Sequence, residues 1–354
     1  MSELKVKKTS KLDELKAMSA KDRNRAIGDL LMNNAMFIII AIAVVGIAIA
    51  EPTFLSIPSI VNIVCLTAAK LPIALGVGGC IILAGTDISA GRQVGLAACI
   101  SAGLQLTANK LFPGLAVMPW YVALLAVMVV GAAFGLVNGF CMAKFKLHPF
   151  IVTLSTQLII YGCILLFLKM GTNAGQTLSG MSQQYQDLIK GTLFRIGNTS
   201  VPNYVLYSAI IAVVVWTIWN KTTFGKNMYA VGSNEEAANV SGVNVEKTII
   251  MVFMMAGMLY ALTGFFDAAR IASVNATTGL NYEADAIAAC VIGGISFVGG
   301  IGKVSGAIIG VLLLQVIFVG LNFLSVDPNL LYIVKGLIIL VACAIDMRKY
   351  LVRK

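Results

Sequence analysis

The break between the second and third apolar runs of the sequence holds three residues that can do chemistry. Asp87 and Arg92 bracket Ser89 there, in a stretch rich in small residues. A charge at bilayer depth is costly and is retained where it is paired or functional. One interpretation is that an Asp87–Arg92 pair shapes a translocation path or its gate. The alternative is a structural ion pair at a helix junction, and the spacing alone leaves both open.

A second charged group follows the seventh apolar run. Asp267 and Arg270 lie three residues apart, on one face of a helix, and can pair. Glu283 and Asp285 begin the next run on different helical faces. We expect the four side chains at the outer end of the protein, either contacting a partner or forming a solvated rim. Lys335, in the middle of the last run, needs an acidic or carbonyl partner that its neighbours do not identify.

Uncharged polar side chains form a third candidate group. Thr153, Thr156 and Gln157 fall on one face of a predicted helix, and Asn138 lies near the end of the preceding one. Such groups either line a passage for a neutral hydroxylated solute or form hydrogen bonds between neighbouring helices.

The sequence lacks the residue patterns for metal binding, disulfide bonding and phosphate binding. His148 is the single histidine and has no second ligand beside it, so no metal site is expected. The seven cysteines are scattered through apolar runs, which is typical of small buried hydrophobes. The phosphate-binding pattern G-x-x-x-x-G-K-[ST] does not occur, because Gly302-Lys303 is followed by Val304.

Composition places these groups in lipid. Of the 354 residues, 58% are hydrophobic and 12% are charged, whereas a soluble domain carries about 25% charged residues. This excludes a soluble enzyme, a nucleic-acid binder and a disulfide-stapled secreted domain. The net charge of +10 does not indicate nucleic acid, because its Lys and Arg residues flank the apolar runs as orientation signals.

Apolar runs long enough to cross the bilayer predict an all-α polytopic membrane protein of about ten transmembrane helices. The predicted helices cover 35–50, 59–84, 91–109, 119–141, 149–170, 204–219, 248–266, 283–300, 303–324 and 329–346. Two glycine series at i, i+4, i+8 predict close helix packing: Gly131, Gly135 and Gly139, and Gly302, Gly306 and Gly310. The echo of Gly91-Arg92-x-x-Gly95 in Gly302-Lys303-x-x-Gly306 indicates two related halves or chance.

Orientation follows from the basic loops. The first 34 residues hold eight Lys or Arg against five acids, and residues 348–354 are also basic. An even number of spans puts both termini on one side, which the positive-inside rule makes cytoplasmic. We therefore predict a cytoplasmic arm (1–34), one transmembrane domain (35–347), an external loop (171–203), a cytoplasmic loop (220–247) and a cytoplasmic C-terminus (348–354).

The cytoplasmic loop carries a helix signal. Ser233 followed by Glu236 matches a capping box, and Glu235 also suits a helix N-terminus. Gly242 is a natural stop. The pattern predicts a short helix over 234–241, which includes Asn234 and exposes Ala237 and Ala238. It either inserts into a groove on another protein or connects two spans without a partner.

Four longer stretches carry a resemblance to a known family. The stretches GTDISAGRQVGLAA (85–98), HPFIVTLSTQ (148–157), FGKNMYAVGSNEEAANVSGVNV (224–245) and YEADAIAACVIGGISFVGGIG (282–302) resemble the monosaccharide permeases of ATP-binding-cassette importers. Thr86 before Asp87 and the Ala90-Gly91-Arg92-Gln93 that follows are closer to the galactose/methyl-galactoside members than to the ribose members. The resemblance covers about residues 50 to 350.

The resemblance implies a multi-pass protein of the bacterial inner membrane with three kinds of partner. They are a cytoplasmic ATPase that hydrolyses ATP, an external sugar-binding protein and a second copy of the permease. Under it, 234–241 is the coupling helix that contacts the ATPase, and this chain binds no cofactor. Ribose or another sugar is the alternative substrate. An ion-coupled secondary transporter that uses the buried carboxylates is the rival from another class.

Overall fold

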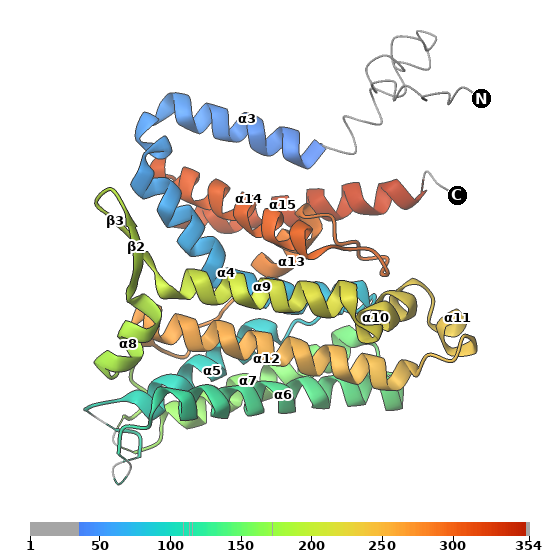
Figure 1. Cartoon of the computed structure of the whole chain (residues 1–354), viewed down its shortest axis with the longest axis horizontal. Helices are drawn as coiled ribbons and strands as arrows, with labels where there is room; N and C mark the ends of the chain where they lie inside the picture. The colour runs from blue at the N-terminus through green and yellow to red at the C-terminus, as the bar shows by residue number, and fades with distance from the viewer. Residues whose placement is uncertain (1–34, 109, 113, 115, 172, 352–354) are drawn as a thin grey trace, which may run out of the picture.

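The computed structural model describes residues 35–351 except 109, 113, 115 and 172. The predicted arm 1–34 and the last three residues of the basic C-terminus lie outside the described residues. The described part is a bundle of helices with two small sheets at one end (Figure 1). This architecture agrees with the predicted all-α class.

The helices follow the apolar runs closely. Their bounds are α3 Ala35–Ala50, η1 Pro52–Leu55, α4 Ile57–Ile82, α5 Ala90–Gln105, α6 Trp120–Phe145, α7 Pro149–Leu168, α8 Gln183–Lys190, α9 Asn203–Lys221, α10 Thr223–Ser233, α11 Glu235–Val240, α12 Val245–Ile271, α13 Tyr282–Ile292, α14 Val304–Phe323 and α15 Pro328–Leu351.

Seven of the described helices are long and apolar enough to cross a bilayer: α4, α6, α7, α9, α12, α14 and α15. The other three predicted spans contain shorter helices: α3 and α5 have 16 residues each, and α13 has 11. The predicted helix over 283–300 therefore ends early, at Ile292, and a turn with left-handed Gly294, Gly299 and Gly300 follows it. A glycine-rich turn of this kind is tolerated at membrane depth only where protein surrounds it.

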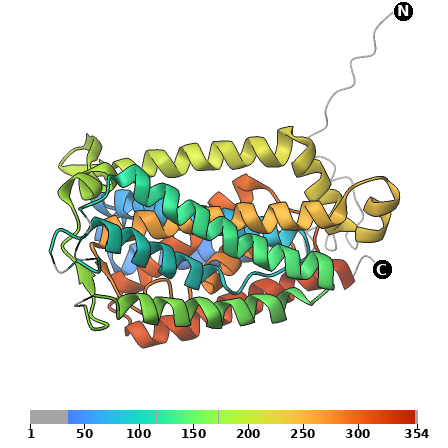
Figure 2. The ribbon, with the colours of Figure 1, turned by 90° about the horizontal axis from the view of Figure 1, so that it is seen from below.

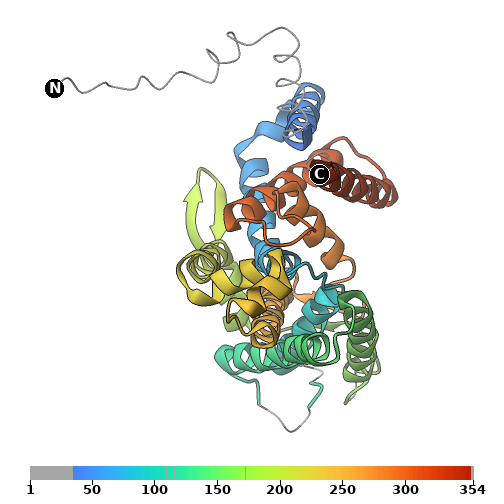
Figure 3. The same cartoon turned by 90° about the vertical axis from the view of Figure 1, so that its right-hand side faces the viewer.

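The long helices run side by side, with α4 and α12 at the centre (Figures 2 and 3). In the most apolar stretches of α4 and α12, 67% and 61% of residues are buried, against 6% in α15. A bundle in lipid gains little by hiding apolar side chains, so close backbone packing must hold its centre.

Glycine provides that packing, as the first glycine series predicts. A Cβ on Gly131, Gly135 or Gly139 of α6 would collide with the backbone of α12. In the second series, Gly306 and Gly310 of α14 lie against Gly293 and Ala289 of the α13 segment in the same way. Gly302 lies in the turn before α14, against the side chains of Ile82 and Ile295.

The two ends of the bundle differ. One end carries α10, α11 and the ends of α3 and α15 that are nearest the chain termini (Figure 1). The opposite end carries α8 and the strands β1 Leu178–Ser179, β2 Thr192–Ile196, β3 Thr199–Pro202 and β4 Ser273–Val274. Strand β1 pairs antiparallel with β4, and β2 with β3. The long loop predicted over 171–203 is therefore largely structured.

Candidate functional site

The loop between α9 and α12 holds the predicted short helix, but with a different cap. Asn234 is the N-cap of α11, because its side chain accepts a hydrogen bond from the Ala237 amide (2.8 Å). Ser233 instead ends α10, and its hydroxyl donates to the Tyr229 carbonyl (2.9 Å). The capping box predicted from Ser233 and Glu236 is therefore wrong by one residue, because Asn and Ser cap equally well and α10 continues up to Ser233.

Exposure along α11 also differs from the prediction in one residue. Ala237 is exposed, whereas Ala238 packs under the helix on Val231 and Val245 and is buried. Val240 is 90% exposed, the most of any large hydrophobic side chain in the described residues. Gly242 adopts a φ of +85°, which ends the helix as predicted. An apolar tip held out from the bundle end suits contact with another protein.

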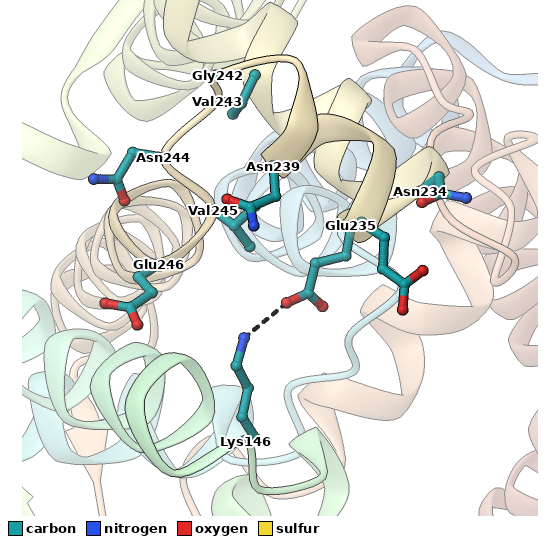
Figure 4. Close-up of a pocket in the computed structure, with 10 residues that line it drawn as sticks. Lys146, Asn234, Glu235, Asn239, Gly242, Val243, Asn244, Val245 and Glu246 are labelled. Carbon is teal, nitrogen blue, oxygen red and sulfur yellow. Dashed lines mark hydrogen bonds and ion pairs between the residues drawn. The ribbon is translucent and has the colours of Figure 1, made fainter.

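A polar cavity of about 920 Å³ separates α11 from the adjacent ends of α6 and α12 (Figure 4). Lys146, in a left-handed conformation just after α6, spans it to Glu235 (2.9 Å). This bond raises the pKa of Lys146 above its ordinary value. Lys144 pairs with Glu246 of α12 (2.5 Å). All four side chains are about half exposed, so the pairs orient α11 and contribute little stability.

A buried polar network lies at the turn between α4 and α5. The Ser89 hydroxyl donates to Asp87 Oδ1 (2.6 Å) and accepts from Gln93 Nε2 (2.9 Å) and Asn138 Nδ2 (3.1 Å). Asn138 Oδ1 in turn accepts from the Thr156 hydroxyl (2.6 Å). The network joins the turn to α5, α6 and α7, and its five side chains are almost completely buried. Four predicted path residues thus belong to one network: Asp87, Ser89, Asn138 and Thr156.

Arg92 and Asp87 do not form the suggested ion pair. Arg92 donates to the Ala276 carbonyl (3.0 Å) and stacks over the Tyr161 ring, 4.3 Å from its centroid. The reason is helical geometry: Asp87 points back at the first turn of α5, whereas Arg92 leaves that helix on another face. Thr153 is buried and bonds to the Pro149 carbonyl of its own helix (2.9 Å). Gln157 is half-buried and bonds to none of these residues.

The charges predicted at a solvated rim lie inside the bundle. Asp267 is fully buried and pairs with Arg270 (2.8 Å), which confirms the predicted pair. Asp285 pairs with Lys335 (2.9 Å), which identifies the missing partner of that lysine. Glu283 is 9% exposed and lies against Gly91, on the neighbouring helix α5. A solvated rim is thus wrong for these carboxylates, because neighbouring helices shield all three side chains.

One central charge was missed from the sequence. Lys70, in the middle of α4, places its ammonium 2.5 Å from the centroid of the Tyr282 ring. A narrow cavity between α4, α13 and α14 is lined by Lys70, Tyr282, Asp285 and Gln315. An ammonium within an apolar run is itself the signal that marks such a position. Its aromatic partner lies more than 200 residues away and carries no such signal.

Seven long apolar helices around buried polar networks, with a capped helix held out at one end, define a membrane-embedded transport protein. The family model for the permease component of branched-chain amino acid transport systems matches residues 59–343. The chain belongs to this family of permease components.

Two named groups of relatives align over nearly the whole chain. The galactose/methyl galactoside import permease of Haemophilus influenzae is 46% identical, over 95% of this chain and 100% of its own length. The Escherichia coli permease of the same name is 42% identical over 92% of this chain and 96% of its own. The ribose import permease of Haemophilus influenzae is 33% identical over 93% and 97%. No solved structure matches the chain.

Proposed function

We propose that this chain is the membrane permease subunit of an ATP-binding-cassette importer that carries galactose and methyl galactoside into the cell. The end-to-end identity of 46% with a permease of that name carries the proposal. The ribose permeases align over a similar length at 33%, so galactose is favoured over ribose. The protein lies in the bacterial inner membrane as a homodimer surrounded by lipid.

The cytoplasmic ATPase docks on α11. The bundle end that carries α11 also carries Lys144, Lys146, Lys221 and Lys226, and this basic loop content favours a cytoplasmic position. Both termini then lie in the cytoplasm. Exposed Val240 and Ala237 are small or apolar groups that suit a groove on the partner. Because the chain has no phosphate-binding loop, the partner hydrolyses the ATP, and this subunit binds no cofactor or metal.

The sugar-binding protein docks at the opposite, external end. Helix α8, the β1–β4 pair and the β2–β3 hairpin form a structured surface there (Figure 1). Every residue of β2 is exposed, including Leu193, Phe194 and Ile196. Ordered strands with exposed apolar side chains fit a protein partner better than a loop that only links two spans.

Transport proceeds by alternating access, in which the ATPase pair moves α11 and the permease halves rock around the polar centre. Asp87 Oδ2, Gln93 Oε1 and Gln157 Oε1 are buried acceptors that receive no hydrogen bond from the described residues. Hydroxyl groups of a sugar are donors that can satisfy them once the helices part. Most of these side chains are sealed here, so the structure represents a state in which this centre is closed.

The test is uptake of labelled galactose into sealed vesicles that contain this chain, its ATPase and its sugar-binding protein. Each component is omitted in turn, and ribose replaces galactose in a parallel series. We expect uptake only with all three proteins and ATP, and slower uptake of ribose. Val240→Asp should reduce ATPase retention at least tenfold, whereas Leu193→Asp, at the other end, should leave it unchanged. Uptake by this chain alone down an ion gradient would contradict the proposal and favour a secondary transporter.

A further inference from the structure

The turn between α13 and α14, residues 293–303, folds back on itself beside the end of α10. The Gly299 amide donates to the Ser296 carbonyl (3.1 Å), and the Ser296 amide donates to the Ile301 carbonyl (3.1 Å). Gly294, Gly299 and Gly300 have φ values of +82°, +87° and +69°. These bonds and the left-handed glycines make the turn a compact body, and what it touches decides where it can move.

One side of the turn lies directly against the end of α10. A Cβ on Gly300 would overlap the Ser233 side chain, and a Cβ on Gly299 would overlap the Gly232 carbonyl. The Tyr229 hydroxyl donates to the Gly302 carbonyl (3.0 Å). Ser233 is followed at once by Asn234, the cap of α11. Ser233 therefore lies directly between the cap of α11 and Gly300.

The same contact reaches the turn between α4 and α5. The Gly300 amide donates to the Ile82 carbonyl at the end of α4 (2.8 Å), and a Cβ on Gly232 would overlap that same carbonyl. Five residues after Ile82 the chain reaches Asp87, which belongs to the buried network with Ser89. The end of α10 therefore meets the α4–α5 turn and the α13–α14 turn at one point.

The far side of the turn is held by α15. Asp346 Oδ2 accepts from the Ser296 hydroxyl (2.9 Å) and from the Phe297 amide (3.2 Å). At its other end, α13 carries Glu283 and Asp285, of which Asp285 is paired with Lys335 of α15. The turn and α13 are therefore clamped to α15 at two places and contacted by α10 at a third.

We propose that the turn of residues 293–303 is the internal receiver of the ATPase movement. Ser233 acts on Gly300, and α13 carries the displacement to the charged groups at its first turn. Tyr229 and Gly300 are positioning residues for transport, and the compact turn is the rigid element between α11 and the polar centre. This inference rests on the proposed function, because it needs an ATPase that moves α11.

The test compares two glycine variants in the assembled three-protein complex. Gly300→Ala and Gly294→Ala both place a side chain at a positive φ in the same turn, but only the first Cβ meets Ser233, since the second has open space. We expect Gly300→Ala to lower galactose uptake per ATP hydrolysed at least tenfold, while ATPase retention stays unchanged. Gly294→Ala should keep the wild-type ratio. Tyr229→Phe, which removes one hydrogen bond, should lower the ratio two- to fivefold.

A second measurement keeps the inference testable if Gly300→Ala fails to assemble. This measurement does not depend on the transported sugar. Val298, 44% exposed on the turn, is replaced by cysteine in a cysteine-free chain, and its labelling rate is measured with and without trapped nucleotide. The labelling rate should change at least threefold on trapping, and Tyr229→Phe should make this change smaller. Equal ratios in all variants, or a labelling rate indifferent to nucleotide, would overturn the inference. Absent uptake in the wild type with intact nucleotide-dependent labelling would instead overturn the assigned substrate.

Discussion

Lys335 Nζ lies 2.9 Å from Asp285 Oδ1, and this ion pair joins the scarcely buried helix α15 to the first turn of α13. Both side chains are mostly shielded, at 24% and 12% exposure. The ammonium also lies over the Phe318 ring of α14, 4.5 Å from its centroid. Because α15 is otherwise scarcely buried, a few polar contacts decide where it sits.

Removing one partner of this pair should destabilise the protein more than removing both. Asp285→Leu leaves a shielded ammonium without its partner, and we expect a loss of about 2–3 kcal/mol in the free energy of unfolding. Lys335→Met should cost a similar amount, and the double variant should recover part of the loss. Thermal unfolding of the four proteins in detergent measures the coupling. Strictly additive effects would show that the pair does not hold α15.

Loss of the Ser89 hydroxyl should destabilise the buried network. Ser89→Ala deprives Asp87, Gln93 and Asn138 of a partner. We expect the free energy of unfolding to fall by about 2 kcal/mol, because several hydrogen bonds of modest individual value are lost. Ser155→Ala is the control, because exposed Ser155 bonds only to the Ile151 carbonyl of its own helix. The midpoints of thermal unfolding compare the two variants. Equal midpoints would mean that the network carries no stability.

A methyl group on Gly135 should push α6 away from α12. A Cβ there overlaps the Phe253 carbonyl, so Gly135→Ala should cost about 1–3 kcal/mol through overpacking. Gly162→Ala on α7 is the matched control, since its Cβ meets nothing within 4 Å. There the more favourable helix propensity of alanine should leave stability unchanged or raise it by about 0.5–1 kcal/mol. A mild effect of both substitutions would argue against glycine-mediated packing.

Substitution of Asn234 should remove the N-cap of α11, whereas substitution of Ser233 should leave it in place. We expect Asn234→Ala to lower the stability of this short helix by about 1 kcal/mol, because the Ala237 amide loses its acceptor. Ser233→Ala removes only a bond within α10. Amide hydrogen exchange over 235–240 measures the difference. Faster exchange in Ser233→Ala than in Asn234→Ala would restore the capping box as the correct interpretation.

Local features of the sequence predicted much of the fold. Runs of apolar residues located every long helix, because the thickness of the bilayer sets the length of a span. Glycines at i+4 spacing marked the packing strip of α6, and Gly242 marked the end of α11. The cap was misplaced by one residue, since Ser233 and Asn234 are both good caps and only the end of α10 distinguishes them.

The candidate site was less predictable. Asp267 and Arg270 were paired correctly because one helix carries both. The suggested Asp87–Arg92 pair was wrong, because Arg92 finds its partner 184 residues away at Ala276. Lys70 was not among the predicted site residues, although a lysine inside an apolar run indicates a functional position. Its partner Tyr282 has no local sequence pattern that predicts the contact.

The sequence by itself determined three properties: the chain is a membrane protein, its helices occupy the apolar runs, and it belongs to a known permease family. These follow from properties read over a few neighbouring residues or from identity with relatives. Only the tertiary structure decided that Glu283 is buried, that Lys335 meets Asp285 and that Ser233 abuts Gly300. The physical reason is that in lipid the specific contacts are polar bonds and close backbone packing. The two residues of each such contact lie 50 or more positions apart in the sequence, and only the folding of the chain brings them together.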